Sequence, residues 1–337
     1  MPCIEFADND PVPLTTFGYG ATGGITVSDL QRYIVEEWAE EYREGRLPRR
    51  EFLRRTALMA GGVALAAPVL QSLGVATSSV EIAEAASSAP PAAAQASGIT
   101  VPPTDPAITA VGMVSFASGS VAVHAYLARP RAGGPSPGVI VIHENRGLLE
   151  HFKDVCRRFA KIGYAALAVD LASADGGTAK FSDSAQVTAI LGRTPPEQLV
   201  AMLNAGVRYL QGQPQVRRDR IGAMGFCFGG GMTWRLATQN AELKAAAPFY
   251  GSNPPLDDVP KIKAAVLAVY GALDQRVNAG IPAVRDALQK ANVVHEMVVY
   301  PDAAHAFFND TGSNYNATAA REAWTKTTAW FDKYLKS

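Results

Sequence analysis

Three residues in the second half of the chain could together supply a nucleophile, a base and an orienting acid. Cys227 stands within Gly-Phe-Cys-Phe-Gly at residues 225–229, after an apolar run and before a helical pattern. This is the strand–turn–helix context of a nucleophile elbow, here with cysteine at the nucleophile position. The tight turn requires small residues two positions before and after the nucleophile, and Gly225 and Gly229 meet that demand. The helix N-terminus that follows favours a thiolate and a developing oxyanion.

An acid and a histidine follow at the ends of two later apolar runs. Residues 266–274 run from a buried-type strand to Asp274, and residues 298–305 repeat this format and end at His305. The gaps between the three residues each leave room for one helix and one strand, so all three fall at carboxyl ends of strands. In this interpretation Cys227 attacks a carbonyl, His305 transfers the proton, and Asp274 orients the imidazole.

Each of these residues also has a purely structural interpretation. Cys227 could be a buried and inert cysteine, and Asp274 could be a turn residue or a helix cap. His143, at the end of another apolar run, is the rival histidine. The other three histidines fall inside predicted strands or at a helix start: His124, His295 and His151. Order, spacing and strand-end placement together favour Cys227, Asp274 and His305.

A second polar segment, His-Glu-Asn-Arg-Gly at residues 143–147, follows the apolar run that ends at residue 142. Its position suits the loop that lends the second N–H group of an oxyanion hole. We expect the backbone N–H of Phe228 to be the first donor and that of Asn145 to be the second. Glu144 is either an ionisable group at the edge of an apolar pocket or a loop carboxylate paired with Arg146.

The elements that must position these residues alternate between short apolar runs and amphipathic stretches. This alternation predicts the α/β class, with a mostly parallel central sheet of about eight strands and helices on both faces. The predicted strands lie near residues 111–117, 121–128, 138–143, 165–170, 219–224, 245–250, 265–270 and 295–300. The predicted helices lie near residues 149–162, 196–212, 228–239, 279–291 and 317–335.

Composition is that of a globular enzyme: 337 residues, of which 48% are hydrophobic and 18% charged. The formal net charge is zero, so nothing indicates binding to nucleic acid or to an anionic membrane surface. Cys3, Cys156 and Cys227 do not form a disulfide framework, and no Cys/His cluster has zinc spacing. We therefore expect neither a metal nor an organic cofactor.

The first hundred residues differ from the rest of the chain. Residues 28–45 predict an amphipathic, acidic helix, and a twin arginine at residues 49–50 precedes a weakly apolar run at residues 56–70. This combination is typical of a twin-arginine (Tat) export signal. An Ala/Ser/Pro-rich stretch at residues 76–100 predicts a disordered linker, and Ala94-Gln95-Ala96 within it is a possible signal-peptidase site.

We therefore divide the chain into an N-terminal region, 1–100, and a catalytic domain, 105–337. The signal predicts a periplasmic or secreted protein that meets the Tat export machinery before maturation. No stable membrane span is expected in the mature form, because the apolar run is short and rich in glycine. The alternatives are a basic helix on a cytoplasmic protein, or a protein anchored by an uncleaved signal.

Four motifs, at residues 143–147, 225–230, 271–274 and 304–307, resemble those of the dienelactone hydrolase family, the carboxymethylenebutenolidases. The resemblance covers about residues 110–335. It implies an α/β-hydrolase fold and a Cys–His–Asp triad. It also implies a role for Glu144, whose carboxylate would contact the thiol at rest, be displaced by substrate, and then help to deprotonate Cys227.

The resemblance also bears on the substrate. Family members that hydrolyse dienelactone hold its carboxylate with arginines, and one of these lies four residues after the histidine, where this chain has Asn309. The loss of a bidentate arginine weakens carboxylate recognition. Candidates for the second arginine are Arg193, Arg146 and Arg276. The side chains expected to contact substrate are those of Arg146, Asn309 and Phe307.

The sequence as a whole predicts a cysteine-dependent hydrolase of small carboxylic esters or lactones that acts through a covalent acyl-enzyme. An acyltransferase or a thioesterase with the same triad is one alternative, and a non-catalytic binding protein of the same fold is another.

Overall fold

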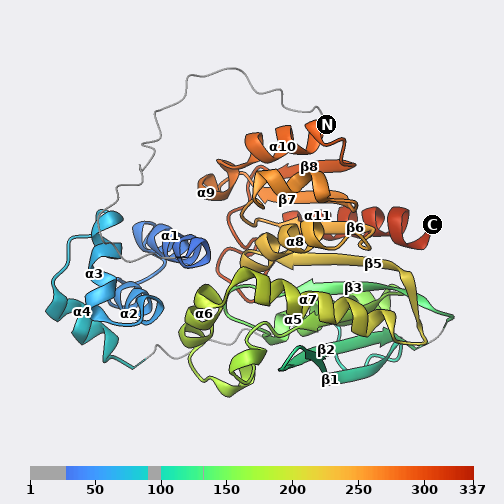
Figure 1. The fold of residues 1–337 in the computed structure, drawn as a ribbon, viewed down its shortest axis with the longest axis horizontal. Coiled ribbons are helices and arrows are strands. Elements are labelled where there is room, and N and C mark those ends of the chain that lie inside the picture. Colours follow the sequence, from blue (N-terminus) through green and yellow to red (C-terminus); the bar gives the residue numbers. More distant parts are fainter. Residues whose placement is uncertain (1–27, 90–99, 132) are drawn as a thin grey trace.

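The computed structural model describes residues 28–89, 100–131 and 133–337 (Figure 1). Within these ranges an eight-stranded sheet runs through the molecule in the order β1-β2-β4-β3-β5-β6-β7-β8. The strands are β1 (Ile108–Ser118), β2 (Val121–Pro130), β3 (Ser136–Ile142), β4 (Ala165–Val169), β5 (Val216–Phe226), β6 (Ala245–Phe249), β7 (Ala265–Gly271) and β8 (His295–Tyr300). β1, β2 and β4 pair antiparallel, and all the other neighbours pair parallel. The predicted fold class is therefore confirmed.

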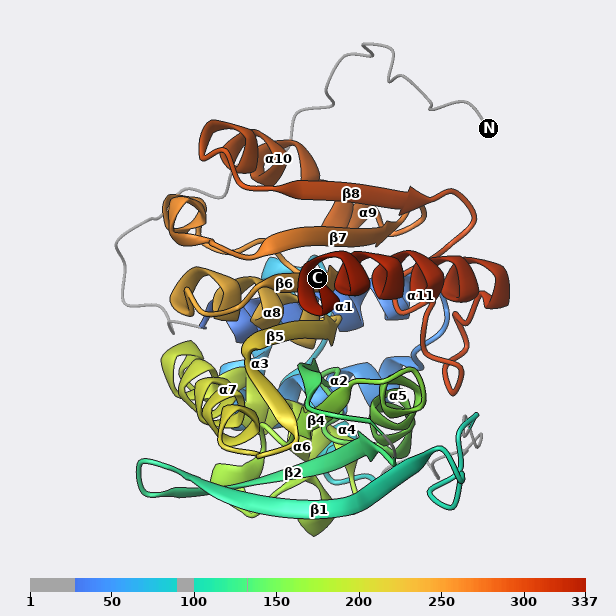
Figure 2. The ribbon, with the colours of Figure 1, turned by 90° about the vertical axis from the view of Figure 1, so that its right-hand side faces the viewer.

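Helices surround this sheet (Figure 2). They are α5 (Glu150–Lys161), α6 (Ser184–Arg193), α7 (Pro196–Gln211), α8 (Phe228–Gln239), α9 (Gln275–Asn278), α10 (Ile281–Lys290) and α11 (Ala317–Phe331). α5 and α11 contact one another through the ring of Phe159, which packs against Trp324 and Phe331. The five helices predicted after residue 105 correspond to α5, α7, α8, α10 and α11, whereas α6 and α9 were not predicted.

Residues 28–89 contain four further helices, which lie together at one side of the sheet (Figure 1). They are α1 (Asp29–Arg43), α2 (Arg49–Ala60), α3 (Val63–Ser72) and α4 (Ser79–Ala86). Ser28 caps α1, and its hydroxyl accepts a hydrogen bond from the backbone N–H of Gln31. The helix predicted at residues 28–45 is therefore confirmed.

The disordered linker predicted over residues 76–100 is wrong for its first half. Ser78 caps α4 by accepting a hydrogen bond from the N–H of Glu81, and Ile82 and Ala85 are buried. An apolar pair on one helix face was enough to pack this helix against α2 and α3, although its composition is poor in large side chains. Residues 90–99, with the predicted peptidase site, lie outside the described residues.

Arginines of α2 hold the N-terminal helices to one another and to the rest of the chain. Arg54 is 3% exposed and donates hydrogen bonds to Glu51 of α2 and to Asp183, which caps α6. Arg49, the first residue of α2, pairs with Glu81 of α4. One contiguous apolar core includes residues of α1–α4 and of the sheet. This continuity places α1 directly beside the carboxyl ends of the central strands.

A search of the described residues for membrane-spanning helices gives no single helix that is long and apolar enough. Within these residues, only α2 and α3 taken together have the length and apolar composition of a membrane span, and the two helices are bent by 115° relative to one another.

Candidate active site

Cys227 occupies the sharp turn between β5 and α8. Its φ of 55° is in the left-handed region, where an L-residue is strained. A Cβ on Gly225 would overlap the backbone of Gly229 and the hydroxyl of Thr233, and a Cβ on Gly229 would overlap the carbonyl of Ile142. The two glycines are therefore required by the approach of α8 to β5 and β3, as the elbow interpretation predicted.

His305 and Asp274 meet at the carboxyl ends of β8 and β7. Nδ1 of His305 lies 2.6 Å from one carboxylate oxygen of Asp274, and the other oxygen accepts a hydrogen bond from the N–H of Val277 in α9. Asp274 is 2% exposed, so this contact is shielded from solvent. The structure thus brings together the predicted acid and histidine in the geometry that fixes an imidazole tautomer.

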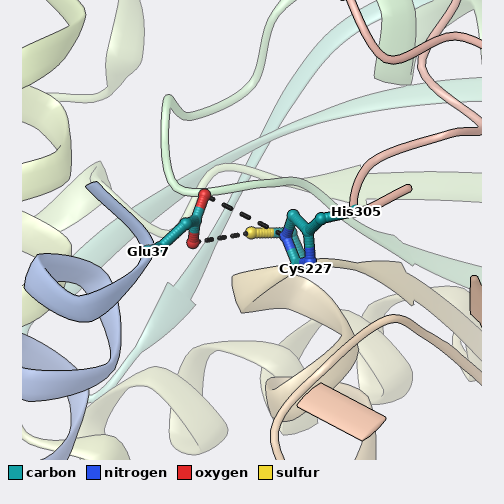
Figure 3. Close-up of side chains that lie close together, drawn as sticks. All are labelled: Glu37, Cys227 and His305. Atoms are coloured by element: carbon teal, nitrogen blue, oxygen red, sulfur yellow. Dashed lines mark hydrogen bonds and ion pairs between the residues drawn. The ribbon is translucent and has the colours of Figure 1, made fainter. Parts of the chain in front are cut away.

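Glu37 of α1 is the residue of this site that sequence reasoning missed (Figure 3). The Cys227 thiol donates to Glu37 at an Sγ–Oε2 distance of 3.3 Å. Oε1 of Glu37 lies 4.0 Å from Nε2 of His305, and it accepts a 3.2 Å hydrogen bond from the side-chain amide of Asn145. The sulfur of Cys227, a ring nitrogen of His305 and a carboxylate oxygen of Glu37 all lie within 4.8 Å of one another. The only signal in the sequence was an acid on the apolar face of a predicted helix, one turn after Tyr33.

The same three side chains offer the donor types that zinc prefers, namely a thiolate, an imidazole and a carboxylate. Within the described ranges, no other group of three or more such side chains has its donor atoms this close together. The sequence had indicated no metal spacing, because Glu37 is distant from the other two along the chain.

Glu144 does not hold the position that the family resemblance implied for it. Its Oε2 accepts a 2.9 Å hydrogen bond from the side-chain amide of Asn309, and Oε1 is buried without a hydrogen-bond partner. Burial raises the pKa of Glu144 above its ordinary value. The carboxylate that contacts the thiol is instead that of Glu37, because α1 projects it into this space.

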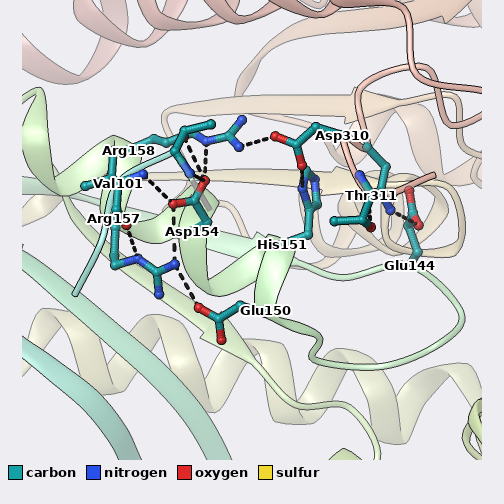
Figure 4. Close-up of polar contacts among 11 residues, drawn as sticks. Val101, Glu144, Glu150, His151, Asp154, Arg157, Arg158, Asp310 and Thr311 are labelled. Carbon is teal, nitrogen blue, oxygen red and sulfur yellow. Dashed lines mark hydrogen bonds and ion pairs between the residues drawn. The ribbon is translucent and has the colours of Figure 1, made fainter. Parts of the chain in front are cut away.

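The loop that carries Asn309 is fixed from behind by a polar network on α5 (Figure 4). Nδ1 of His151 lies 2.7 Å from one carboxylate oxygen of Asp310, and Arg158 pairs with the other. Asn309 in turn accepts hydrogen bonds from the N–H and hydroxyl of Thr311. These contacts hold the amide of Asn309 against Glu144 and support the floor of the site.

The rival histidine, His143, is occupied by backbone groups. Its Nδ1 lies 2.7 Å from the carbonyl oxygen of Glu144, and its Nε2 accepts a hydrogen bond from the N–H of Leu171. Burial lowers the pKa of His143 and favours its neutral form. Both ring nitrogens therefore serve to shape the loop after β3.

The predicted oxyanion-hole residues flank the nucleophile. Phe228 is the first residue of α8, so its N–H has no acceptor within the helix. Asn145 is buried in the loop after β3 and lines the same pocket as the thiol. The positive end of α8 thus faces the region where charge would develop.

A pocket of about 190 Å³ opens over the thiol. Carboxylates predominate among its ionisable side chains, since Glu37, Glu40, Glu41 and Glu144 face it together with Arg46 and Arg146. The remaining lining residues are Trp38, Asn145, Leu149, Cys227, His305, Ala306, Asn309, Thr311, Gly312, Ser313 and Asn314. α1 and the turn after it therefore form one wall of the pocket.

Two of the three predicted substrate contacts face the pocket. Arg146 and Asn309 line the pocket, but Phe307 does not. Phe307 is fully buried, with its ring against Tyr250 and Tyr300, so its assignment as a substrate contact is wrong. An aromatic residue next to the site was needed to fill the core behind it.

The two other arginine candidates have different surroundings. Arg276 pairs with Glu40 at 3.2 Å and lies 4.5 Å from the ring centroid of Tyr33. Arg193 ends α6 and does not line the pocket. Neither guanidinium is placed to clamp a substrate carboxylate.

Burial and charge together keep the thiol protonated. Desolvation and, next, the charge of Glu37 raise the pKa of Cys227 to about 12, whereas His305 lowers it by a smaller amount. Burial also opposes protonation of His305, but the carboxylate of Asp274 outweighs it and raises the pKa of the imidazole. Burial raises the pKa of Asp274, yet His305 overcomes this effect and holds it below its ordinary value.

The comparisons with known proteins point to one family. The model of the dienelactone hydrolase family matches residues 123–335. A protein of Escherichia coli O157:H7, provisionally named a carboxymethylenebutenolidase, is 36% identical over 258 residues, which cover 72% of this chain and 94% of that protein. A protein of Methylorubrum extorquens with the same provisional name is 36% identical over 224 residues, 63% of this chain and 77% of that one.

Two solved structures extend the comparison. A Klebsiella pneumoniae protein, provisionally described as a dienelactone hydrolase, matches with a TM-score of 0.63 and 35% identity. The match covers 68% of this chain and all of that one. The dienelactone hydrolase-like promiscuous phosphotriesterase P91, from metagenomic libraries, matches with a TM-score of 0.61 and 30% identity, over 68% and 99% of the two chains.

Proposed function

Because this chain belongs to the dienelactone hydrolase family, we propose that it hydrolyses carboxylic esters or lactones through a covalent thioester on Cys227. The observation that carries the proposal is the 2.6 Å contact between His305 and the buried Asp274, directly beside a cysteine in a strained elbow. An oriented imidazole next to a nucleophile in a glycine-dependent turn is the arrangement that acyl transfer requires.

The reaction assigns one task to each side chain. Sγ of Cys227 attacks the acyl carbon, and the thiol proton passes to Nε2 of His305. The C–O bond then breaks, and Nε2 returns this proton to the leaving oxygen. Water attacks the thioester while His305 accepts a proton from it, the C–S bond breaks, and the sulfur regains its proton. Asp274 stabilises the imidazolium in both steps.

The oxyanion that forms at the acyl carbon needs donors that are in place beforehand. The N–H groups of Phe228 and Asn145 are proposed for this role, because one begins α8 and the other lies in the loop after β3. Such donors are worth about 100-fold to 1,000-fold in turnover when they are aligned with the developing charge.

The test measures hydrolysis of an uncharged aryl ester and an uncharged lactone by the full chain. Cys227→Ala should lower turnover by at least about 1,000-fold, because it removes the nucleophile. Cys156→Ala is the matched control, since Cys156 is buried in α5 and does not line the pocket. Equal turnover in Cys227→Ala and the wild type would overturn the proposed function.

A further inference from the structure

We propose that Glu37 is a specificity-determining residue, which makes this site favour esters and lactones with a neutral or cationic acyl group over those that carry a carboxylate. The inference rests on the proposed hydrolase function and adds a substrate class to it. The inference is based on the wall of the pocket that α1 forms. α1 precedes residue 123, where the match to the family begins.

α1 is positioned over the thiol by side chains that leave little freedom. Tyr33 and Glu37, one helical turn apart, both reach the sulfur, at 4.0 Å and 3.3 Å. Two contacts fix α1 to the hydrolase domain. The side-chain amide of Asn145 donates a hydrogen bond to Glu37, and Arg276 forms an ion pair with Glu40. As a result Cys227 is only 2% exposed.

Any acyl group that reaches Cys227 must lie next to the carboxylate of Glu37. Glu37 is itself largely buried, so water screens its charge weakly, and like charges a few ångströms apart repel strongly in such surroundings. A substrate carboxylate would meet this repulsion at the acyl carbon, whereas an ammonium group would be attracted. The pocket volume of about 190 Å³ leaves a small acyl group little room to avoid Glu37.

The other carboxylates that face the pocket add less to this bias. Glu40 is paired with Arg276, and burial raises the pKa of Glu41 and of Glu144, which favours their neutral forms. Two arginines line the pocket. Arg46 pairs with Glu44, whereas Arg146 has no acidic partner within salt-bridge distance among the described residues. Four carboxylates against two guanidinium groups give the pocket an excess of acidic side chains.

The test compares alkylation of Cys227 by iodoacetamide, which is neutral, with alkylation by iodoacetate, which is anionic. Mass spectrometry of the full chain identifies the modified residue, and free cysteine supplies the intrinsic ratio of the two rates. We expect the wild type to favour iodoacetamide about 10-fold or more beyond that intrinsic ratio. In Glu37→Gln the ratio should fall towards the value for free cysteine.

The ratio has an advantage over either rate alone. Both reagents attack the same thiolate, so a change in the pKa of Cys227 cancels. Glu36→Gln is the matched control, because Glu36 lies beside Glu37 on α1 but does not line the pocket. This variant should keep the wild-type ratio.

Aryl esters of matched size then connect the thiol to the substrate. We expect kcat/KM to decrease in the order cationic, neutral and anionic acyl group, with a smaller spread in Glu37→Gln. An unchanged spread, or equal alkylation ratios in wild type and Glu37→Gln, would overturn the inference. If no ester is hydrolysed while the alkylation ratios behave as expected, the proposed function fails and Glu37 still stands as the charge filter of this thiol.

Discussion

The thiol of Cys227 is almost fully buried and lies beside the carboxylate of Glu37. Burial and the charge of Glu37 raise its pKa to about 12, so the sulfur is protonated at neutral pH. Under the proposed mechanism, the resting protein therefore holds its nucleophile in the less reactive form, which also limits oxidation of the thiol. Activation requires that substrate weaken the influence of Glu37 or strengthen that of His305.

This balance predicts a change in the pH dependence of thiol reactivity. A negative neighbour raises a thiol pKa, so Glu37→Gln should lower the pKa of Cys227 and move the rise of iodoacetamide labelling to lower pH. For every tenfold increase in the acid dissociation constant of the thiol, the thiolate fraction at neutral pH rises about 10-fold. Labelling should become faster by less than this factor, because a less basic thiolate is a weaker nucleophile. The labelling rate of Cys227, followed by mass spectrometry across pH, gives the result. A profile that stays in place or moves to higher pH would show that Glu37 does not act on the thiol.

Positions set by local sequence features were predictable. Cys227 lies in the predicted turn between a strand and a helix, and Asp274 and His305 follow apolar runs; the structure places the last two in contact. Glu37 was not predictable, because it lies 190 positions before Cys227 and only tertiary packing brings them together. Glu144 was misplaced for the same reason, since the space beside the sulfur is already filled.

At the scale of elements, the N-terminal helices are attached through a buried cluster of charge. Arg54 donates to Glu51 within α2 and to Asp183 at the start of α6. Burial works against the ionised carboxylates, but Arg54 outweighs it and holds the pKa of both Glu51 and Asp183 below their ordinary values. Removing one partner from such a cluster leaves a buried charge without its full compensation.

This attachment should weaken on acidification and on loss of Asp183. A carboxylate with a lowered folded-state pKa contributes stability above its ordinary pKa and loses it as the pH falls through the folded value. Asp183→Asn should cost about 1–3 kcal/mol and increase hydrogen exchange in α2 at neutral pH. Wild-type α2 should show the same increase only below about pH 4, the ordinary range of these groups.

The control for this experiment is Asp257→Asn, which changes an exposed aspartate far along the chain. It should leave exchange in α2 unchanged. Exchange in Asp183→Asn equal to the wild type would mean that apolar packing alone holds the N-terminal helices.

Elements with a strong hydrophobic period were predictable, and those fixed by tertiary contacts were not. All eight strands of the sheet were predicted, because each is a short apolar run bounded by polar or glycine-rich residues. α4 was mistaken for a linker, since its few apolar side chains are buried only by packing on other helices. α6 was missed, and its start is fixed by Asp183, which serves both as helix cap and as partner of Arg54.

At the scale of the whole molecule, the N-terminal helices and the hydrolase domain share one apolar core. The twin-arginine signal, export and a periplasmic location stay predictions, and removal of the signal near residue 96 would take α1 and Glu37 away. A chain that uses Glu37 must therefore keep residues 28–89 in its mature form. This requirement agrees with the alternative of an uncleaved signal.

The retained N-terminus is directly measurable. We expect the protein isolated from its native cells to keep α1–α4, with peptides that cover residues 28–89 present in stoichiometric amounts. Intact-mass spectrometry with N-terminal peptide mapping gives the result, and fractionation of the same cells shows the compartment. A mature N-terminus near residue 97 would establish signal cleavage and exclude Glu37 from the working enzyme.

Under the proposed function Cys227 carries the acyl group during turnover, so we would first measure the mass of the protein quenched within one turnover of an aryl ester. We expect an increase equal to the acyl group, located on Cys227 by peptide mapping, which disappears as product accumulates and is absent in Cys227→Ala. An adduct on another residue, or hydrolysis with no adduct at Cys227 under single-turnover conditions, would contradict it.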